Sequence, residues 1–194
     1  MTNLRFPHTL IELSINLTDE QFCQLCQNNR DYQFERTAQG ELLIRPPTGS
    51  ETSRCNADLT FQVRAWNHQT KLGIVFDSSG GFTLPNGADR SPDASWVKKE
   101  RWDALTPEQK EGFAPLCPDF VVELRSKTDS LKKLPEKMQE YRENGAKLGW
   151  LLDRKNQRVE IYRPGQAVEI ISNPATLSGE DILPGFVLDL AEII

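Results

Sequence analysis

The stretch that most constrains this chain spans residues 119–153. It opens with the apolar, β-branched run DFVVEL, continues through KLPEKMQEYRENG and closes with LGWLLD. β-Branched residues that follow a proline are typical of a strand. Leu134, Met138 and Tyr141 recur at spacings of four and three, which indicates one face of a helix, and Asn144-Gly145 is a typical helix end. The stretch therefore predicts a strand–helix–strand unit at the heart of the fold.

The first predicted strand places charge beside an apolar core. Side chains on a strand alternate between its two faces. Glu123 and Arg125 then share one face, while Phe120, Val122 and Leu124 share the other. Because burying an unpaired charge is costly, the charged pair needs partners: each other, a metal ion or a phosphate.

The predicted helix brings a cation close to this strand. Proline is tolerated in a first helical turn, so we expect the helix to begin near Pro135 after a turn at residues 129–133. Lys137 then lies one turn in and can lean back toward the preceding strand. Taken alone, Lys137 fits a solvated helix lysine better than a catalytic one.

Shorter elements surround this unit. A Thr18 capping box predicts a helix that ends near residues 28–29. Helical spacing predicts an amphipathic helix over about 50–70 and a helical turn near 106–108. Strands are expected at 32–36, 41–45, 73–77, 82–84, from Asp93 onward, at 158–163 and at 168–172, and a strand and short helix in the tail.

This order of elements predicts one mixed α+β (α/β) domain over residues 1–194. We expect its core at about 30–163, an N-terminal helix within 1–30, and a C-terminal hairpin and tail over 164–194. The 194 residues, 38% of them hydrophobic, suffice for such a core.

Composition excludes several classes of function. No apolar run reaches membrane-spanning length and the N-terminus lacks a signal-peptide pattern, so a cytoplasmic location is the default expectation. A formal net charge of -5 means that nucleic acid would need a local basic patch. The two histidines argue against a histidine-rich metal site or a histidine-based triad. The glycine-rich phosphate-binding motifs are missing from the sequence as well.

The four cysteines are too scattered to indicate a disulfide framework. Cys23 and Cys26 have the spacing of a metal or redox pair, but they fall on a predicted helix and a second ligand pair is missing. Buried small hydrophobic residues are the favoured interpretation.

Three carboxylates fall at predicted strand starts: Glu41, Asp93 and Glu123. Two carboxylates from adjacent strands can hold Mg²⁺ or Mn²⁺ through oxygen ligands. Such an ion polarises a phosphate and lowers the pKa of a bound water. Lys137 or Arg125 could then position that water or neutralise developing charge.

Each carboxylate also has a simpler interpretation. Glu123 and Arg125 could form an ordinary salt bridge at a sheet edge, which we expect about equally. Asp93 follows Ser-Pro and on its own favours a turn cap. Glu41 on its own favours an exposed strand residue.

Several segments taken together resemble a known family. SPDASWV, PDFVVELRSKTDSLKKLPEKMQEYRENGAKLGWLLD, GELLIRPPTG, VEIYRPG and LPGFVLDL resemble the Uma-type restriction endonuclease family, a branch of the PD-(D/E)XK nuclease superfamily. The resemblance covers nearly the whole chain and is specific as a combination. It implies a restriction-endonuclease-like fold, with a mixed central β-sheet flanked by helices, and a metal-dependent nuclease site.

The resemblance also implies roles for individual residues. Asp93 and Glu123 match the two acids that bind the metal, and Lys137 matches the helix lysine of the family. Glu41 matches the acid of the Gly-Glu-Leu strand. Arg125 stands where the superfamily motif has lysine; this departure matters because arginine is too basic to exchange a proton.

The expected function is thus a Mg²⁺-dependent DNA endonuclease, with Mn²⁺ as another possible cofactor. Nucleases of this architecture often cut as symmetric dimers, so a homodimer is expected. The alternatives are a catalytically inactive nuclease-fold protein that binds nucleic acid and a non-nuclease interaction module. A basic rim for DNA would comprise Lys98, Lys99, Arg101, Arg125, Lys127, Lys132 and Lys133.

Overall fold

The computed structural model describes residues 11–15, 17–45, 47–126 and 133–194. The helices are α1 (Asp19–Asn28), α2 (Ser50–Thr70), α3 (Lys99–Asp103), α4 (Pro107–Glu111) and α5 (Lys133–Glu143). The strands are β1 (Ile11–Ser14), β2 (Gln33–Arg36), β3 (Glu41–Arg45), β4 (Gly73–Asp77), β5 (Phe82–Thr83), β6 (Asp89–Arg90), β7 (Ala94–Lys98), β8 (Phe120–Leu124), β9 (Leu148–Asp153), β10 (Arg158–Tyr162), β11 (Glu169–Ser172), β12 (Thr176–Ser178) and β13 (Val187–Asp189).

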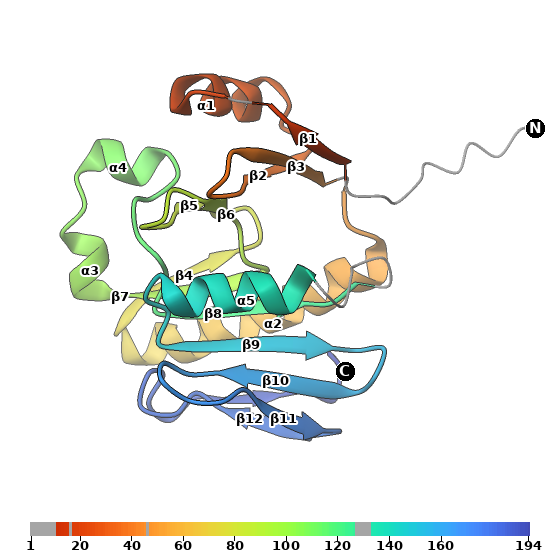
Figure 1. Ribbon diagram of the computed structural model, residues 1–194. Helices are drawn as coiled ribbons and strands as arrows, with labels where there is room; N and C mark the ends of the chain where they lie inside the picture. The colour runs from red at the N-terminus through yellow and green to blue at the C-terminus, as the bar shows by residue number, and fades with distance from the viewer. Residues whose placement is uncertain (1–10, 16, 46, 127–132) are drawn as a thin grey trace, which may run out of the picture.

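A mixed main sheet organises the molecule, with strand order β11-β10-β9-β8-β7-β4 (Figure 1). β8 and β9 run parallel, and α5 forms the crossover between them. β7 runs antiparallel to β8 on its other side. The predicted strand–helix–strand unit is therefore confirmed, and with it the mixed central sheet flanked by helices.

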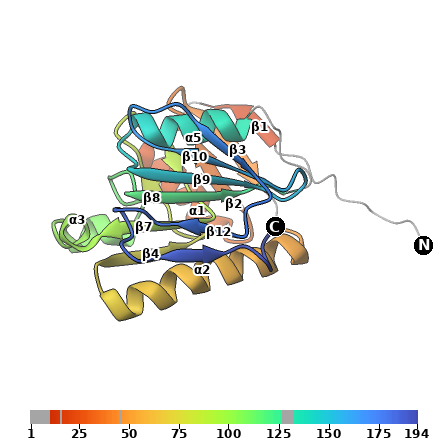
Figure 2. The same cartoon turned by 90° about the horizontal axis from the view of Figure 1, so that it is seen from below.

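The two faces of the main sheet are covered differently (Figure 2). On one face, Phe120, Val122 and Leu124 pack in a core with residues of α2 and of the β12–β13 pair. On the other face, Val121 packs in a second core with Met138 of α5. The alternation predicted for β8 is thus confirmed, and every residue of that strand is buried.

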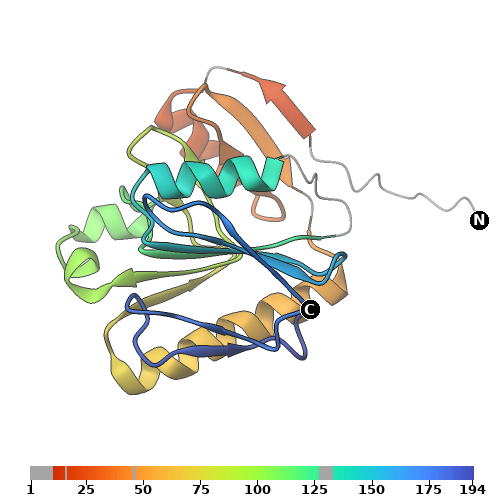
Figure 3. The same cartoon turned by 60° about the horizontal axis from the view of Figure 1, so that its bottom comes forward.

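A second sheet, of order β1-β3-β2-β6-β5, lies on the far side of α5 (Figures 1 and 3). Phe34 and Leu42 of this sheet pack with Phe22 of α1 in a small third core. Helix α5 is consequently sandwiched between two sheets, which removes its inner side chains from water.

Sequence-based boundaries differ from the structure in a few places. Helix α5 already includes Lys133, and most of the turn expected at 129–133 lies outside the described residues. The expected tail strand is β13, but it pairs with a strand that we did not predict, β12. After β13 the described tail turns instead of forming the expected helix.

Two further findings concern the length of the helices and the state of the cysteines. No helix within the described part of the chain is both long and apolar enough to cross a membrane. All four cysteines are free; Cys26 is half-buried on α1, but Cys23 is exposed, so the interpretation as buried small hydrophobic residues is wrong for Cys23.

Candidate active site

The strand register brings Asp93 and Glu123 together. In the β7–β8 ladder Ala94 pairs with Val122 and Ser95 with Val121. One step further along this register, Asp93 falls opposite Glu123. Directly opposed residues on antiparallel strands are close neighbours. The two acids therefore meet where β7 begins and β8 ends.

Asp93 is oriented from two sides. Its Oδ2 accepts a hydrogen bond from the backbone N–H of Leu124 at 2.7 Å, and its Oδ1 accepts one from Asn56 Nδ2 of α2 at 2.9 Å. The contact to Leu124 locks Asp93 to the strand that carries Glu123. Burial nevertheless raises the pKa of Asp93, because these contacts, with Lys137 and Arg45, only partly offset desolvation.

Glu123 is a buried acid, only 1% exposed, and it points toward α5. Its Oε1 lies 2.6 Å from Lys137 Nζ and accepts a hydrogen bond from the Tyr141 hydroxyl at 3.1 Å. Burial, with the nearby carboxylates of Asp93 and Glu35, outweighs Lys137 and raises the pKa of Glu123 to about 7. Burial is the largest cause of this shift, so the charge of Lys137 only partly offsets the loss of water around Glu123.

Lys137 is buried, which excludes its interpretation as a solvated helix lysine. Its Nζ also lies 2.7 Å from Oε1 of Glu35, a β2 residue, and within 3.5 Å of the Ser91 carbonyl oxygen. One ammonium thus bridges two buried carboxylates that come from different sheets.

Glu35 is a member of the cluster that the sequence analysis missed. Besides Lys137, it receives a hydrogen bond from the backbone N–H of Ser91 at 3.0 Å and lies 3.5 Å from both Arg45 and Arg90. Burial would raise the pKa of Glu35, but Lys137, Arg45 and Arg90 together lower it to about 2. The only sequence signal was one acid beside Phe34 on a short strand.

Glu41 lies apart from this cluster. It is exposed at the start of β3, and the hydrogen bonds described there join its backbone to Thr37. The simpler interpretation, an exposed strand residue, describes its position. Glu35 of the neighbouring strand lies where we expected an additional acid.

Arg125 pairs with Asp153 on the neighbouring strand. Its Nη1 lies 2.8 Å from Oδ1 of Asp153, the last residue of the adjacent strand β9, and both side chains are buried. The salt bridge between Glu123 and Arg125 that the sequence suggested is therefore replaced by one pair to Lys137 and another to Asp153. Glu123 also lies on an interior strand of the sheet instead of at an edge.

The expected basic rim is only partly at the surface. Arg125 is buried and cannot belong to it. Lys98, Lys99 and Arg101 pair with Glu100, Asp103 and Asp119 respectively, while Lys133 is exposed. Lys127 and Lys132 lie outside the described residues.

The residues around Asp93 and Glu123 have the chemistry that a hard divalent cation requires. Over the described ranges, no set of three or more His, Cys, Asp or Glu side chains is arranged to hold a metal ion by itself. Two carboxylates with raised pKa values meet here, however, and the buried Oδ1 of Asn56 beside Asp93 has no hydrogen-bond partner among the described residues. Oxygen donors of this kind suit Mg²⁺ or Mn²⁺ when water or a phosphate completes the coordination.

The mixed sheet flanked by helices is of the nuclease-like fold class, and two acids and a lysine converge at the end of one of its strand pairs. One solved structure with this architecture is a "putative nuclease belonging to DUF820" from Anabaena variabilis; it aligns with a TM-score of 0.69 and 19% sequence identity, over 82% of this chain and 88% of that one. The search of curated proteins found no match. The family model Uma2, described as "Putative restriction endonuclease", matches residues 19–191. The chain belongs to the Uma2 family, as the sequence resemblance predicted, and this membership supports a nuclease function.

Proposed function

We propose that this protein is a metal-dependent endonuclease that hydrolyses phosphodiester bonds of DNA, with Asp93, Glu123 and Lys137 at its centre. The observation that carries the proposal is the 2.6 Å contact between Lys137 and Glu123 in a buried site. One step beyond the paired residues of β7 and β8, the strand register places Asp93 opposite Glu123. Buried charges persist where they have partners or a function, and perturbed acids gather at functional sites.

Asp93 and Glu123 would hold the cation. Mg²⁺ or Mn²⁺ bound there would supply a polarised phosphate oxygen and a more acidic water. Asn56 and the Leu124 N–H fix the direction of Asp93, and the Tyr141 hydroxyl fixes that of Glu123. Fixed ligands reduce the reorganisation that a reaction would otherwise require.

Lys137 would stabilise negative charge on the phosphate or on the attacking hydroxide. An ammonium is a compact charge with three donors, so Lys137 can turn one donor to a substrate while it keeps its carboxylate contacts. Arg125 is held by Asp153, which supports a role for Arg125 at the end of β8 instead of in the chemistry.

The family description, a restriction endonuclease, supports DNA as the substrate. We further propose a symmetric homodimer, in which each protomer would cut one strand. Light scattering coupled to gel filtration measures that oligomeric state directly, and a mass of one chain would contradict the dimer.

Cleavage of supercoiled plasmid with Mg²⁺ or Mn²⁺ tests the proposed site. Asp93→Asn and Glu123→Gln keep side-chain size while removing charge, and Lys137→Met removes the ammonium. All three should lose cleavage by about 100-fold or more. Glu111→Gln, an exposed acid on α4, is the matched control and should cleave like the unaltered protein.

Glu41→Gln and Glu35→Gln test the two acids of the β2–β3 hairpin one at a time. Because Glu41 is exposed and lies apart from the cluster, this variant should retain cleavage, whereas Glu35→Gln should lose it. Nicking that persists in Asp93→Asn at the original rate would remove Asp93 from the site. DNA binding without any cleavage would favour a catalytically inactive nuclease-fold protein, and Mn²⁺ titration that yields no heat in either the unaltered protein or Glu123→Gln would favour an interaction module.

A further inference from the structure

A line of five charges of alternating sign runs from the candidate active site to the protein surface. We call Glu123, Lys137, Glu35, Arg90 and Glu140 the charge chain. Lys137 Nζ lies 2.6 Å from Glu123 and 2.7 Å from Glu35. Arg90 follows, with Nη1 3.5 Å from Glu35 Oε2 and Nε 2.6 Å from Glu140 Oε2.

The members of the charge chain come from four elements. Glu123 is on β8, Glu35 on β2 and Arg90 on β6, and α5 carries both Lys137 and Glu140. Lys137 and Glu140 are three positions apart, so they lie on neighbouring turns of one helix. Glu35 and Arg90 therefore form a bridge through the second sheet between two residues of the same helix.

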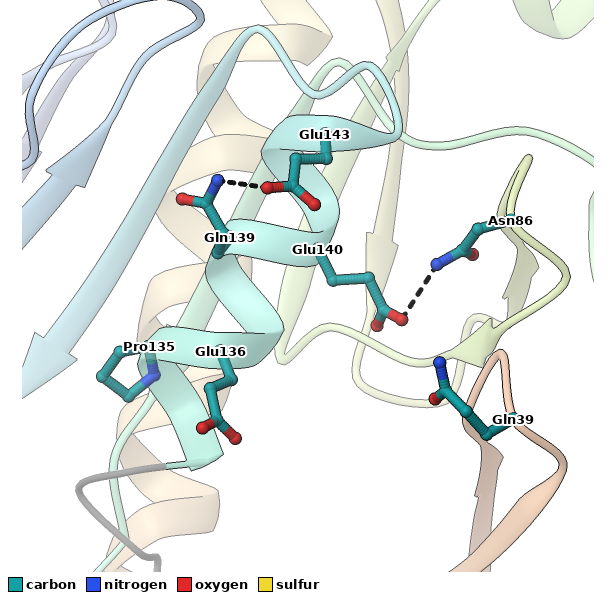
Figure 4. Close-up of a pocket in the computed structure, with 7 residues that line it drawn as sticks. All are labelled: Gln39, Asn86, Pro135, Glu136, Gln139, Glu140 and Glu143. Carbon is teal, nitrogen blue, oxygen red and sulfur yellow. Dashed lines mark hydrogen bonds between the residues drawn. The ribbon is translucent and has the colours of Figure 1, made fainter.

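The outer end of the charge chain meets a surface hollow of about 480 Å³ (Figure 4). Glu140 lies at its wall, where its Oε1 accepts a hydrogen bond from Asn86 Nδ2 at 3.0 Å. Asn86 is itself held, because its backbone N–H donates to Asn144 Oδ1 at 2.9 Å. Glu140 is the most exposed member of the charge chain: its side chain is 17% exposed, against 8% for Arg90 and 1% for Glu35.

Lys137 needs such support because its own side chain is long and has many rotamers. The groups that face its ammonium are the carboxylates of Glu123 and Glu35, the carbonyl oxygen of Ser91 and the ring of Tyr141, whose centroid lies 5.7 Å away. Glu35 is thus one of the two anions that fix Lys137, and its other oxygen faces Arg45 and Arg90 at 3.5 Å. Arg90 is in turn anchored to α5 through Glu140.

We propose that Arg90 and Glu140 are positioning residues that hold Glu35 and, through it, set the place of the Lys137 ammonium against Glu123. This inference rests on the proposed nuclease function for the role of Lys137. Neither residue would touch the substrate. Partners that orient an active-site group are known to affect activity by about 10- to 100-fold when removed.

The kinetic test compares Arg90→Gln and Arg90→Lys with the unaltered protein in metal-dependent cleavage. Arg90→Gln should lower kcat by about 10- to 100-fold with little change in KM, since a displaced ammonium weakens transition-state stabilisation more than binding. Arg90→Lys keeps the charge and should recover part of the lost kcat. Glu140→Gln should act in the same direction, and its effect should largely vanish in the Arg90→Gln background, because both residues act through Glu35.

Glu143→Gln is the matched control. Glu143 lies one turn beyond Glu140 on α5 and lines the same hollow, but its described contact is with Gln139 and it is outside the charge chain. This variant should cleave like the unaltered protein. An Arg90→Gln enzyme with unchanged kcat, or one in which KM alone rises, would overturn the proposal.

A second measurement does not depend on cleavage. The side-chain ammonium of Lys137, assigned by its loss in Lys137→Met, should give a slowly exchanging ¹H–¹⁵N signal in the unaltered protein and in Glu143→Gln. Arg90→Gln should shift or broaden that signal while the fold is retained; an unchanged signal would overturn the proposal. Should Arg90→Gln fail to fold, Glu140→Gln, nearly the same in shape, supplies the same two readouts. If the unaltered protein cuts no DNA, the nuclease function fails while the Lys137 signal alone still decides the positioning role.

Discussion

The Lys137 ammonium lies 2.6 Å from Oε1 of Glu123 and 2.7 Å from Oε1 of Glu35, so one cation serves two buried acids. The pKa values of the two acids are shifted in opposite directions. Burial opposes ionisation of both, but Glu35 also faces Arg45 and Arg90 and keeps a pKa of about 2. Glu123 faces further carboxylates, and its pKa is raised to about 7. An added cation would therefore stabilise the ionised form of Glu123 more than that of Glu35.

The first prediction concerns stability and pH. The unfolded chain releases the Glu123 proton near pH 4.5, whereas the folded chain retains it up to about pH 7. Folding therefore becomes less favourable as the pH rises between these values, by on the order of 3 kcal/mol. Glu123→Gln should remove this decline, as measured by urea unfolding at pH 5, 6, 7 and 8.

Glu35 changes the pH dependence of stability in the opposite direction. Because its pKa is lowered, its stabilisation is present above pH 4.5 and is lost as the pH falls toward 2. Glu123→Gln should therefore still lose stability as the pH falls below 4.5. Glu111→Gln serves as control and should keep the full pH profile; a flat profile in the unaltered protein would contradict the raised pKa of Glu123.

The second prediction concerns divalent cations. A cation that binds Glu123 must displace its proton, so Mn²⁺ should raise the melting temperature more at pH 8 than at pH 6. Differential scanning fluorimetry with a Mn²⁺ series at both pH values measures this. Asp93→Asn should abolish the shift, and an equal shift in that variant would place the ion elsewhere.

The third prediction concerns Asn56, whose Nδ2 donates to Asp93 Oδ1 at 2.9 Å. Asn56→Ala removes one of the two hydrogen bonds that orient Asp93 and the unpartnered oxygen beside it. Mn²⁺ affinity should fall by about 10-fold or more in isothermal titration. Arg64→Ala, an exposed position on the same helix, should leave the affinity unchanged, and equal losses in both variants would indicate a general effect on α2.

The fourth prediction concerns Gly73 at the start of β4. A Cβ there would lie 2.3 Å from a ring carbon of Trp96 and 2.3 Å from the Val97 carbonyl oxygen, so backbone would have to move. Gly73→Ala should lower the free energy of unfolding by about 1–3 kcal/mol. A Cβ at Gly112 meets nothing within 4 Å, so Gly112→Ala is the control for chemical denaturation. Equal stability of the two variants would contradict the close approach.

The local elements could be predicted from the sequence because short-range rules govern them. The alternation along Phe120–Leu124 identified the two faces of β8, and the spacing of Leu134, Met138 and Tyr141 identified the inner face of α5. The family resemblance also pointed to Asp93, Glu123 and Lys137. The structure places those three together, because the β7–β8 register and the α5 crossover bring them to one end of the strand pair.

The partners of the charged residues could not be predicted in the same way. Arg125 pairs with Asp153 across a parallel ladder, and Glu35 reaches Lys137 only because a second sheet packs on α5. These contacts join residues far apart in the chain, and no local periodicity encodes which strand lies beside which. The family resemblance pointed to Glu41, and nothing in the sequence pointed to Glu35: both lie on one hairpin, and only the packing of that hairpin decides which acid is buried.

The sequence by itself determined the strand–helix–strand unit, its apolar and charged faces and the acids and lysine available for chemistry, because alternation and helical spacing act over a few residues. The tertiary structure alone decided that Glu35, Arg90 and Glu140 connect Lys137 to the surface. Charges in a core must find partners wherever the packed elements bring them.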